Sequence, residues 1–149
     1  MNTRADAVGV TMENVVKKYG QTTALRDFGL VVESGEMVVL LGPSGCGKTT
    51  ALRCLAGLES VNGGRILVGD RDITHVPVQK REMAMVFQSY SLFPHLNALD
   101  NVAFGLKQKG VRGQELKTRV ERAMETVQIG DFGNRRPDQL SGGQRQRVA

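Results

Sequence analysis

The segment GPSGCGKTT, residues 42–50, restricts the possible folds of this chain more than any other part of its sequence. It matches the pattern G-x-x-x-x-G-K-[ST], and the fixed positions are Gly42, Gly47, Lys48 and Thr49. The longest apolar run, residues 37–41, precedes it and has the composition of a strand buried on both faces. A helical pattern follows it. Strand, glycine-rich turn and helix in this order predict the phosphate loop of an α/β nucleotide-binding core.

The residue types in this segment suit a polyphosphate ligand. Glycines let the backbone turn tightly and approach a ligand closely, and successive N–H groups at a helix N-terminus attract anions. We expect Lys48 to bridge the β- and γ-phosphates and the Thr49 hydroxyl to hold Mg²⁺. A glycine turn that contains a lysine by chance is the alternative. The expected nucleotide-binding residues are Gly42, Ser44, Gly45, Cys46, Gly47, Lys48, Thr49 and Thr50.

Five short runs in the first ninety residues have strand character. They are residues 8–16, 24–32, 37–41, 65–68 and 83–87. In the helix after the phosphate loop, the side chains that we expect to face the sheet are Ala51, Leu52, Leu55 and Leu58.

After Gln88 the pattern becomes helical. The sequence predicts helices over residues 99–109 and 113–129, and the second carries an apolar stripe of Leu116, Val120, Ala123 and Val127. We therefore expect a β-rich subdomain with the phosphate-loop core over residues 1–88 and a helical subdomain over residues 89–149.

Composition limits the classes of function. Apolar residues make up 40% of the 149 residues and charged residues 23%, as in ordinary globular proteins. No run is long enough to cross a bilayer, and no secretory signal is visible, so we expect a cytoplasmic protein. The net charge of +5 is scattered and aromatic residues are only 5%, which argues against a nucleic-acid partner. The two cysteines, Cys46 and Cys54, are expected to be free thiols.

Further motifs accompany the phosphate loop in a fixed order. Tyr19 lies in KKYG, Gln88 lies in MVFQSYSLFPHLNALDNV, and LSGGQ occupies residues 140–144. Together with LLGPSGCGKTT, these motifs resemble the nucleotide-binding domain of ATP-binding-cassette (ABC) proteins from about Val10 to Ala149. The resemblance implies a phosphate-loop ATPase core with a small antiparallel β region and a helical subdomain. It also implies ATP and Mg²⁺ as ligands.

The same resemblance assigns roles to individual residues. It implies that Tyr19 stacks on adenine, and that Gln88 reaches Mg²⁺ and the attacking water. It implies that the signature residues contact ATP held by the opposite subunit of a head-to-tail dimer: Ser141, Gly142, Gly143 and Gln144. A strand end at Tyr19 and a strand cap at Gln88 are the simpler readings of those two residues.

The signature can also be read as local helix chemistry. Ser141 and Gln144 form an S-x-x-Q capping box, which by itself only starts a helix. The two glycines between them weaken a helix by roughly 1 kcal/mol each relative to alanine. We interpret them as leaving the N–H groups open to a phosphate from a partner subunit.

The segment after Gln88 resembles that of importer ATPases, especially those for polyamine, iron(III), sulfate or sugar uptake. This resemblance implies membrane permease subunits as partners, a solute-binding protein outside the membrane as an indirect partner, and a peripheral position on the inner face of the cell membrane. A permease helix would dock on an apolar cluster of Leu92, Phe93, Leu96 and Leu99, although these side chains could equally pack inside the subdomain.

The family's magnesium-binding aspartate, catalytic glutamate and switch histidine lie beyond the signature. The sequence up to Ala149 contains none of these motifs, so we expect the C-terminal part of the ABC domain to be missing and hydrolysis by this chain alone to be at most a trace. The strand that contains the carboxylates would pair beside residues 37–41, so an exposed apolar sheet edge is also expected. The alternatives to an importer subunit are an inactive or regulatory ATP-binding fragment and a soluble, non-transport ABC ATPase.

Overall fold

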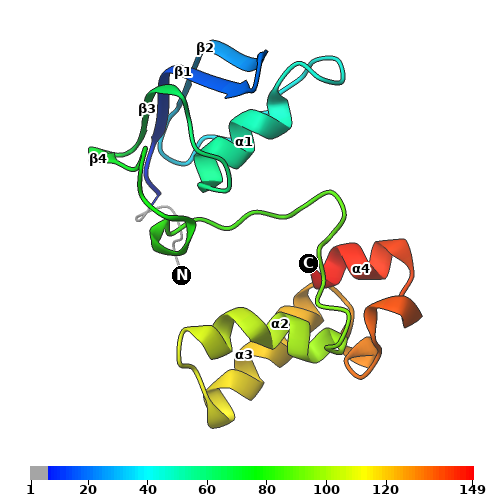
Figure 1. Cartoon of the computed structure of the whole chain (residues 1–149). Helices are drawn as coiled ribbons and strands as arrows, with labels where there is room; N and C mark the ends of the chain where they lie inside the picture. Colours follow the sequence, from blue (N-terminus) through cyan, green and yellow to red (C-terminus); the bar gives the residue numbers. More distant parts are fainter. Residues whose placement is uncertain (1–6) are drawn as a thin grey trace. The chain divides into compact units, whose positions relative to one another are not determined.

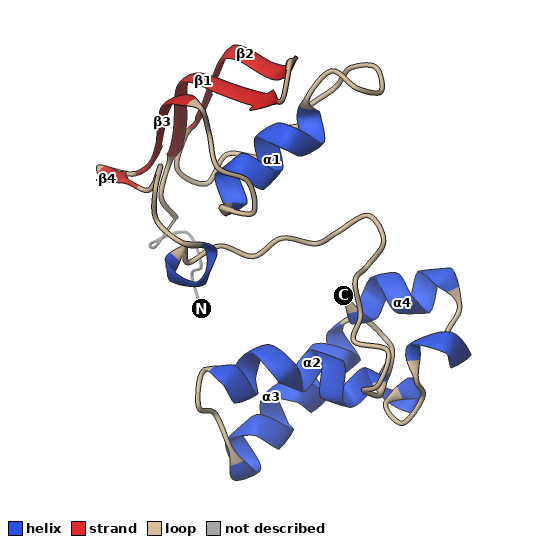
Figure 2. Cartoon of the chain, in the orientation of Figure 1, coloured by secondary structure: helices blue, strands red, loops and turns tan. Residues whose placement is uncertain are grey.

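The computed structural model describes residues 7–149 of the chain (Figure 1). Contacts within the chain divide it into two compact units, one that ends at Met85 and one that runs from Val86 to Ala149. The first unit contains the strands and the phosphate-loop helix, and the second is helical (Figure 2). We describe each unit by itself.

The first unit is built on a four-stranded antiparallel sheet. Its strands are β1 (Val10–Tyr19), β2 (Thr22–Val32), β3 (Gly63–Val68) and β4 (Arg71–Asp72), in the order β2-β1-β3-β4. A two-residue turn that contains Gly20, at a φ of 56°, joins β1 to β2. Three of the predicted strands, those around residues 8–16, 24–32 and 65–68, are confirmed, as is the antiparallel character of the region.

Helix α1 (Lys48–Ala56) packs against this sheet. The core between them consists of Met12, Val15, Leu25, Ala51, Cys54, Ile66 and Ile73. The prediction for α1 was partly wrong: Leu52 and Leu58 are exposed at 45% and 42%, whereas Cys54 is fully buried. The buried positions 51 and 54 and the partly buried position 55 follow the helical repeat, while Leu58 lies beyond the glycine that ends the helix, Gly57 at a φ of 77°.

Two predicted strands are wrong. Residues 37–41 and 83–87 form no strand, and Met37 and Leu41 are 88% and 87% exposed. An apolar run becomes a buried parallel strand only when neighbouring strands satisfy its N–H and C=O groups. Within residues 7–149 no strand lies beside either run. Residues 37–41 therefore expose apolar side chains, as expected, but not as the edge of a sheet.

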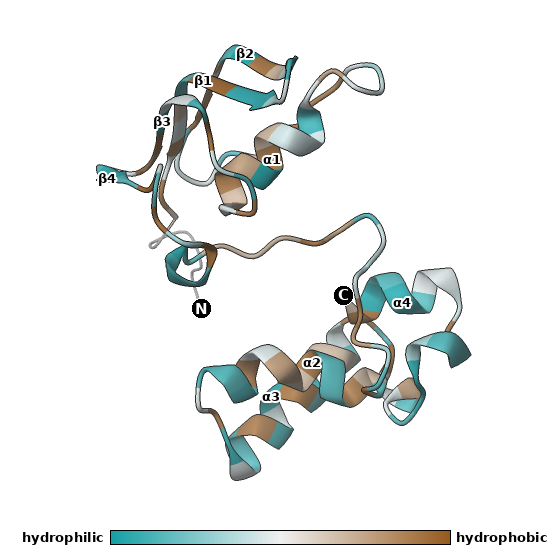
Figure 3. Ribbon diagram, in the orientation of Figure 1, coloured by the Kyte–Doolittle hydropathy of each residue, from teal (hydrophilic) through white to brown (hydrophobic). Residues whose placement is uncertain are grey.

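The second unit packs three helices around its own core. They are α2 (Ala98–Gln108), α3 (Gly113–Thr126) and α4 (Gly142–Val148), and both long predicted helices are confirmed. In Figure 3, α2 and α3 each carry apolar and polar positions in alternation, as helices with one buried face do. The core consists of Ala98, Ala103, Val120, Met124, Ile129, Leu140 and Val148.

The stripe predicted for α3 was half right. Leu116 and Val120 face the core, but Ala123 and Val127 are exposed and Met124 is buried instead. Positions 116, 120 and 124 repeat every four residues, and α3 ends at Thr126 before Val127 is reached.

No helix among residues 7–149 is both long and apolar enough to cross a membrane.

Candidate functional site

The backbone of the phosphate loop has the conformation that its glycines permit. Gly42, Gly45 and Gly47 have φ values of 152°, 83° and 96°, where other residues are strained. Gly47 is the N-cap of α1, with no side-chain capping bond. A Cβ at Gly47 would lie 2.8 Å from the Ala24 carbonyl oxygen and 2.8 Å from Leu25 Cδ2. Glycine is thus required here to bring α1 close to β2.

Lys48 folds back over this loop. Its Nζ donates hydrogen bonds to the carbonyl oxygens of Gly42 (2.6 Å) and Pro43 (2.7 Å), and it lies 3.4 Å from Cys46 Sγ. Thr49 is exposed in the first turn of α1, which contains no acidic residue. The positive end of the helix, the ammonium group and the exposed hydroxyl therefore meet at one place, a combination that favours an anion.

The two cysteines lie in very different surroundings. Both are free thiols, as predicted, with Cys46 exposed in the phosphate loop and Cys54 buried under the sheet. Burial raises the pKa of the Cys54 thiol, although the nearby ammonium of Lys17 opposes this effect. Of these two thiols, only Cys46 is accessible to a reagent.

Tyr19, at the end of β1, is held by two charged neighbours. The ammonium of Lys17 lies 4.8 Å from the centre of the Tyr19 ring. The same ammonium donates a hydrogen bond to the Ser60 carbonyl oxygen (2.7 Å) and forms an ion pair with Glu59 Oε2 at 3.0 Å. The neighbouring Lys17 ammonium lowers the pKa of the Glu59 carboxyl group.

Arg81 is a buried residue that the sequence analysis missed. Its guanidinium group donates hydrogen bonds to the carbonyl oxygens of Cys54 (2.7 Å), Leu55 (2.7 Å) and Thr74 (3.0 Å). Burial lowers the pKa of this group. By binding the last carbonyl groups of α1, Arg81 fixes the end of the helix that begins at the phosphate loop. The sequence signal that could have pointed to Arg81 is Gly57, because its left-handed conformation and its missing Cβ let the guanidinium group approach.

The signature residues begin helix α4. The predicted capping box is confirmed: Gln144 N donates to Ser141 Oγ (3.3 Å), and Ser141 N donates to Gln144 Oε1 (2.8 Å). A Cβ at either Gly142 or Gly143 would meet no atom within 4 Å. Neither glycine has a positive φ. The fold of this unit therefore gives no reason for glycine at these two positions.

Gln88 lies exposed in a turn, and the segment after it is held by an asparagine that sequence reasoning missed. The side chain of Asn101 accepts a hydrogen bond from Phe93 N (2.8 Å) and donates to the carbonyl oxygens of Phe93 and Leu96, both at 3.2 Å. Phe93 also contacts Phe104 of α2, with ring centres 4.4 Å apart. These contacts fix the segment to α2.

An apolar groove of about 330 Å³ lies between α2 and α3. Leu99, Ala103, Leu116 and Val120 supply its apolar lining, and Lys107, Lys117 and Glu121 are also at its surface. Of the cluster predicted as a docking surface, Phe93 and Leu99 are each 39% exposed, whereas Leu92 packs against the core of the unit. The cluster is therefore partly exposed and partly packed, and the groove adds Leu116 and Val120 of α3, which the sequence analysis had not assigned to a docking surface.

The predicted site residues are divided between the two units. The phosphate loop and Tyr19 belong to the first unit, while Gln88 and residues 141–144 belong to the second. Among residues 7–149, no cluster of three or more His, Cys, Asp or Glu side chains that could hold a metal ion is found.

Comparison with known proteins places these features in one family. The model of the family described as ABC transporter matches residues 25–149. The chain is 56% identical over 140 residues to the Fe(3+) ions import ATP-binding protein FbpC of Brucella suis, a match that covers 94% of this chain and 40% of that protein. It is 50% identical to the spermidine/putrescine import ATP-binding protein PotA of Haemophilus influenzae, with 94% and 38% covered.

A solved structure shows the same fold. It is a dimer of an ATP-binding cassette in a post-hydrolysis state, bound to ADP and Pi, and it superimposes with a TM-score of 0.84 at 32% identity. The match covers 93% of this chain and 66% of that one. The chain spans about 40% of the length of the curated relatives described above. With the family model matched over most of its length, the chain belongs to the ABC transporter family.

Proposed function

We propose that this chain is the ATP-binding part of an importer ATPase, and that its phosphate loop holds the triphosphate. The observation that carries the proposal is the loop itself, in which three positive-φ glycines lead into α1 and Lys48 lies above them. Lys48 then exchanges its two carbonyl partners for the β- and γ-phosphate oxygens. Tyr19 stacks on the base.

Mg²⁺ fits the oxygen donors that the chain supplies. Magnesium prefers hard oxygen ligands and keeps several waters when it binds with phosphates. The exposed Thr49 hydroxyl, adjacent to Lys48, and the amide oxygen of Gln88 are the groups that would hold it. When bound, the ion neutralises charge on the phosphate oxygens.

Import is the process that the relatives support. The two relatives described above are named as ATP-binding proteins for Fe(3+) and for spermidine/putrescine import, at 56% and 50% identity. We infer that the complete protein hydrolyses ATP and couples this reaction to uptake through a membrane permease, from the inner face of the membrane. A solute-binding protein outside the membrane delivers the solute to the permease.

A second copy of the ATPase completes the nucleotide site in this proposal. Residues 141–144 contact the triphosphate bound by the partner copy, through N–H groups that Gly142 and Gly143 leave uncovered. The solved cassette at 32% identity, described as a dimer, supports this arrangement.

The groove between α2 and α3 is the proposed docking surface for the permease. Its apolar lining and its charged residues, Lys107 and Glu121 among them, suit a short amphipathic helix. The segment that contains Phe93, fixed by Asn101, extends the exposed apolar surface of this unit.

Calorimetric titration of ATP·Mg into the 149-residue protein tests nucleotide binding. Lys48→Ala should weaken binding by about tenfold to a hundredfold, because it removes a charge-assisted contact to phosphate. Lys80→Ala, which removes an exposed lysine from the same unit, should leave the Kd unchanged. Equal affinities of the wild-type and Lys48→Ala proteins would refute the proposal.

Assembly of the complete ATPase with its permease tests the groove. Leu116→Glu should prevent co-purification with the permease while ATP binding stays intact, because it places a charge in the apolar lining. Val127→Glu, at an exposed position just after α3, is the matched control and should assemble normally. Normal assembly of the Leu116→Glu variant would exclude this docking surface.

A further inference from the structure

We propose that Lys17 and Glu59 form a brace that holds the Tyr19 ring for stacking on the nucleotide base. The brace makes binding depend on the base as well as on the phosphates. This inference rests on the proposed function, because it assigns a cause to the orientation of a residue in that nucleotide site. Lys17 and Glu59 are positioning residues and contact no substrate.

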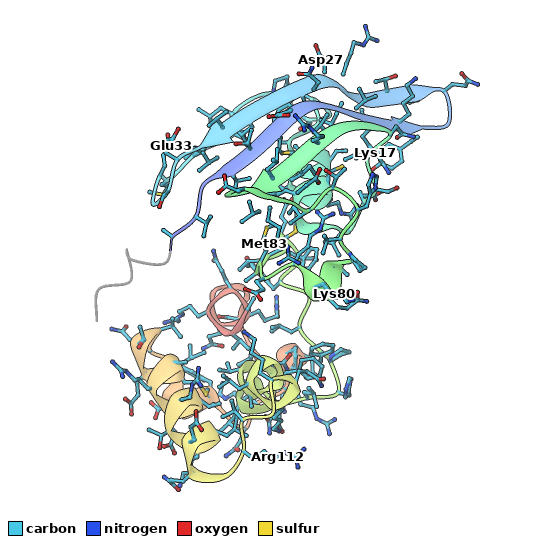
Figure 4. The ribbon with its side chains drawn as sticks, turned by 90° about the vertical axis from the view of Figure 1, so that its left-hand side faces the viewer. Lys17, Asp27, Glu33, Lys80, Met83 and Arg112 are labelled. Atoms are coloured by element: carbon cyan, nitrogen blue, oxygen red, sulfur yellow. The ribbon has the colours of Figure 1, made fainter. Side chains whose placement is uncertain are left out.

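The first step of the argument is the unusual burial of Lys17. Its side chain is only 8% exposed, although lysine is almost never fully buried unless it is paired. Lys17 and Tyr19 are two residues apart on β1, and the Lys17 ammonium reaches the Tyr19 ring across the register shift that follows Lys17. Figure 4 shows Lys17 in the first unit, and its ammonium group lies 4.8 Å from the centre of the Tyr19 ring.

The second step is that the ammonium cannot move freely. The Ser60 carbonyl oxygen and the Glu59 carboxylate hold it at 2.7 Å and 3.0 Å, and these residues lie three and two positions after Gly57, which ends α1. The Ser60 carbonyl oxygen and the Glu59 carboxylate therefore fix the ammonium group beside the Tyr19 ring.

The third step concerns the faces of the ring. An ammonium at 4.8 Å from the ring centre covers one face of Tyr19, at a distance typical of a cation–π contact. Tyr19 as a whole remains 45% exposed. A planar base can therefore stack only on the opposite face. Because α1 connects the phosphate loop to Gly57 and Glu59, the brace also fixes Tyr19 relative to the phosphate-binding helix.

The experiment compares two ligands, ATP·Mg and inorganic tripolyphosphate·Mg, on the full 149-residue chain. Lys17→Met keeps an unbranched apolar stem and removes the ammonium. It should raise the Kd for ATP about threefold to tenfold, as expected for loss of part of one stacking contact, and leave the Kd for tripolyphosphate unchanged. Glu59→Gln should do the same to a smaller extent, while Arg53→Gln, at an exposed residue 4.0 Å from Glu59, should have no effect.

A spectroscopic signal reports on Tyr19 itself. The chain has two tyrosines and no tryptophan, so Tyr90→Phe leaves Tyr19 as the single fluorescent residue. In this background, ATP should quench the tyrosine emission, and Lys17→Met should reduce that quenching. In Tyr19→Ala, the further change Lys17→Met should not affect ATP binding, because the brace then has nothing to hold.

The outcomes separate the brace from the nucleotide site. If Lys17→Met weakens both ligands equally, or if its effect persists in Tyr19→Ala, the brace is overturned while the phosphate site stands. If Tyr19→Ala leaves the ratio of the two Kd values unchanged, base stacking and the brace both fail. If the wild-type chain binds neither ligand, the proposed function fails and the brace fails with it.

Discussion

The two glycine-rich turns of this chain differ in why they contain glycine. In the phosphate loop, Gly42, Gly45 and Gly47 have positive φ values, and Gly47 packs against the backbone of β2. At the start of α4, Gly142 and Gly143 have ordinary helical geometry and open space around them. The first set is needed to fold the turn, whereas the second is not.

The helix starts differ in the same way. Helix α1 begins at Gly47 without a side-chain cap, whereas Ser141 and Gln144 cap α4 reciprocally. The first N–H groups of α1, which no side chain caps, remain free to bind a ligand held by this chain. A turn that is already capped, yet keeps two destabilising glycines, suggests selection for access by another molecule. Substitutions in the two turns test this contrast.

The largest effect is expected for Gly47→Ala. Its Cβ would be 2.8 Å from the Ala24 carbonyl oxygen at a φ of 96°, so strain and overlap together should lower the free energy of unfolding by about 2–4 kcal/mol. Gly45→Ala, with a φ of 83° but no neighbour within 4 Å, should cost only about 1–2 kcal/mol. Urea denaturation measures both. Equal costs would show that packing against β2 is unimportant.

The next effect concerns pairing of the complete ATPase. Ser141→Arg places a large side chain at the turn proposed to receive the partner's nucleotide, so ATP-driven dimerisation should weaken about thirtyfold or more. ATP binding by the single chain should not change. Analytical ultracentrifugation with ATP measures the pairing, and Gln146→Arg, an exposed position in the same helix, is the control. Undiminished pairing of Ser141→Arg would remove the proposed role of the signature.

A smaller effect is expected for thiol modification. A maleimide should label Cys46 and not Cys54, because Cys46 is exposed and the pKa of the buried Cys54 thiol is raised. Bound ATP should slow the labelling of Cys46 about tenfold at roughly ten times its Kd, as simple occupancy requires. Mass spectrometry of the labelled peptide follows the rate. The same rate with and without ATP would place Cys46 outside the nucleotide site.

The smallest expected effect is a gain in stability rather than a loss. Gly142→Ala and Gly143→Ala should each stabilise the second unit by about 0.5–1 kcal/mol, because alanine suits a first helical turn better and meets no neighbour. Each should nevertheless weaken ATP-driven pairing of the complete protein. Thermal unfolding and the dimerisation assay give the two values. Loss of stability would show that the fold itself requires these glycines.

Local sequence patterns predicted the helices well, but they failed for two strands, because a strand needs neighbouring strands to form. The helices predicted from spacing over residues 99–109 and 113–129 form over residues 98–108 and 113–126, and the predicted capping box at Ser141 is present. Residues 37–41 and 83–87 were predicted as strands from their apolar composition, yet they form none. A helix satisfies its own hydrogen bonds, whereas a strand depends on neighbours that composition does not reveal.

The candidate site also combines residues that the sequence identified with residues that only the structure revealed. The glycine-lysine pattern identified the phosphate loop, and the resemblance to ABC proteins identified Tyr19, Gln88 and the signature as candidates. The residues that hold them, Arg81 at the end of α1, Asn101 behind Phe93, and Lys17 beneath Tyr19, were not predicted. Arg81 and Asn101 act on residues of other segments, and Lys17 is held beside Tyr19 by Glu59 and Ser60, which are distant in sequence, so no short motif marks these contacts.

The sequence by itself determined the helices, the glycine-rich turns and the family, because each depends on residues that are close together in the chain. Only the tertiary structure decided that Lys17 is buried, that its ammonium pairs with Glu59 beside the Tyr19 ring, and that Gly47 is required by β2. The physical reason is burial, because the effect of a charged group or of a missing side chain depends on the atoms packed against it.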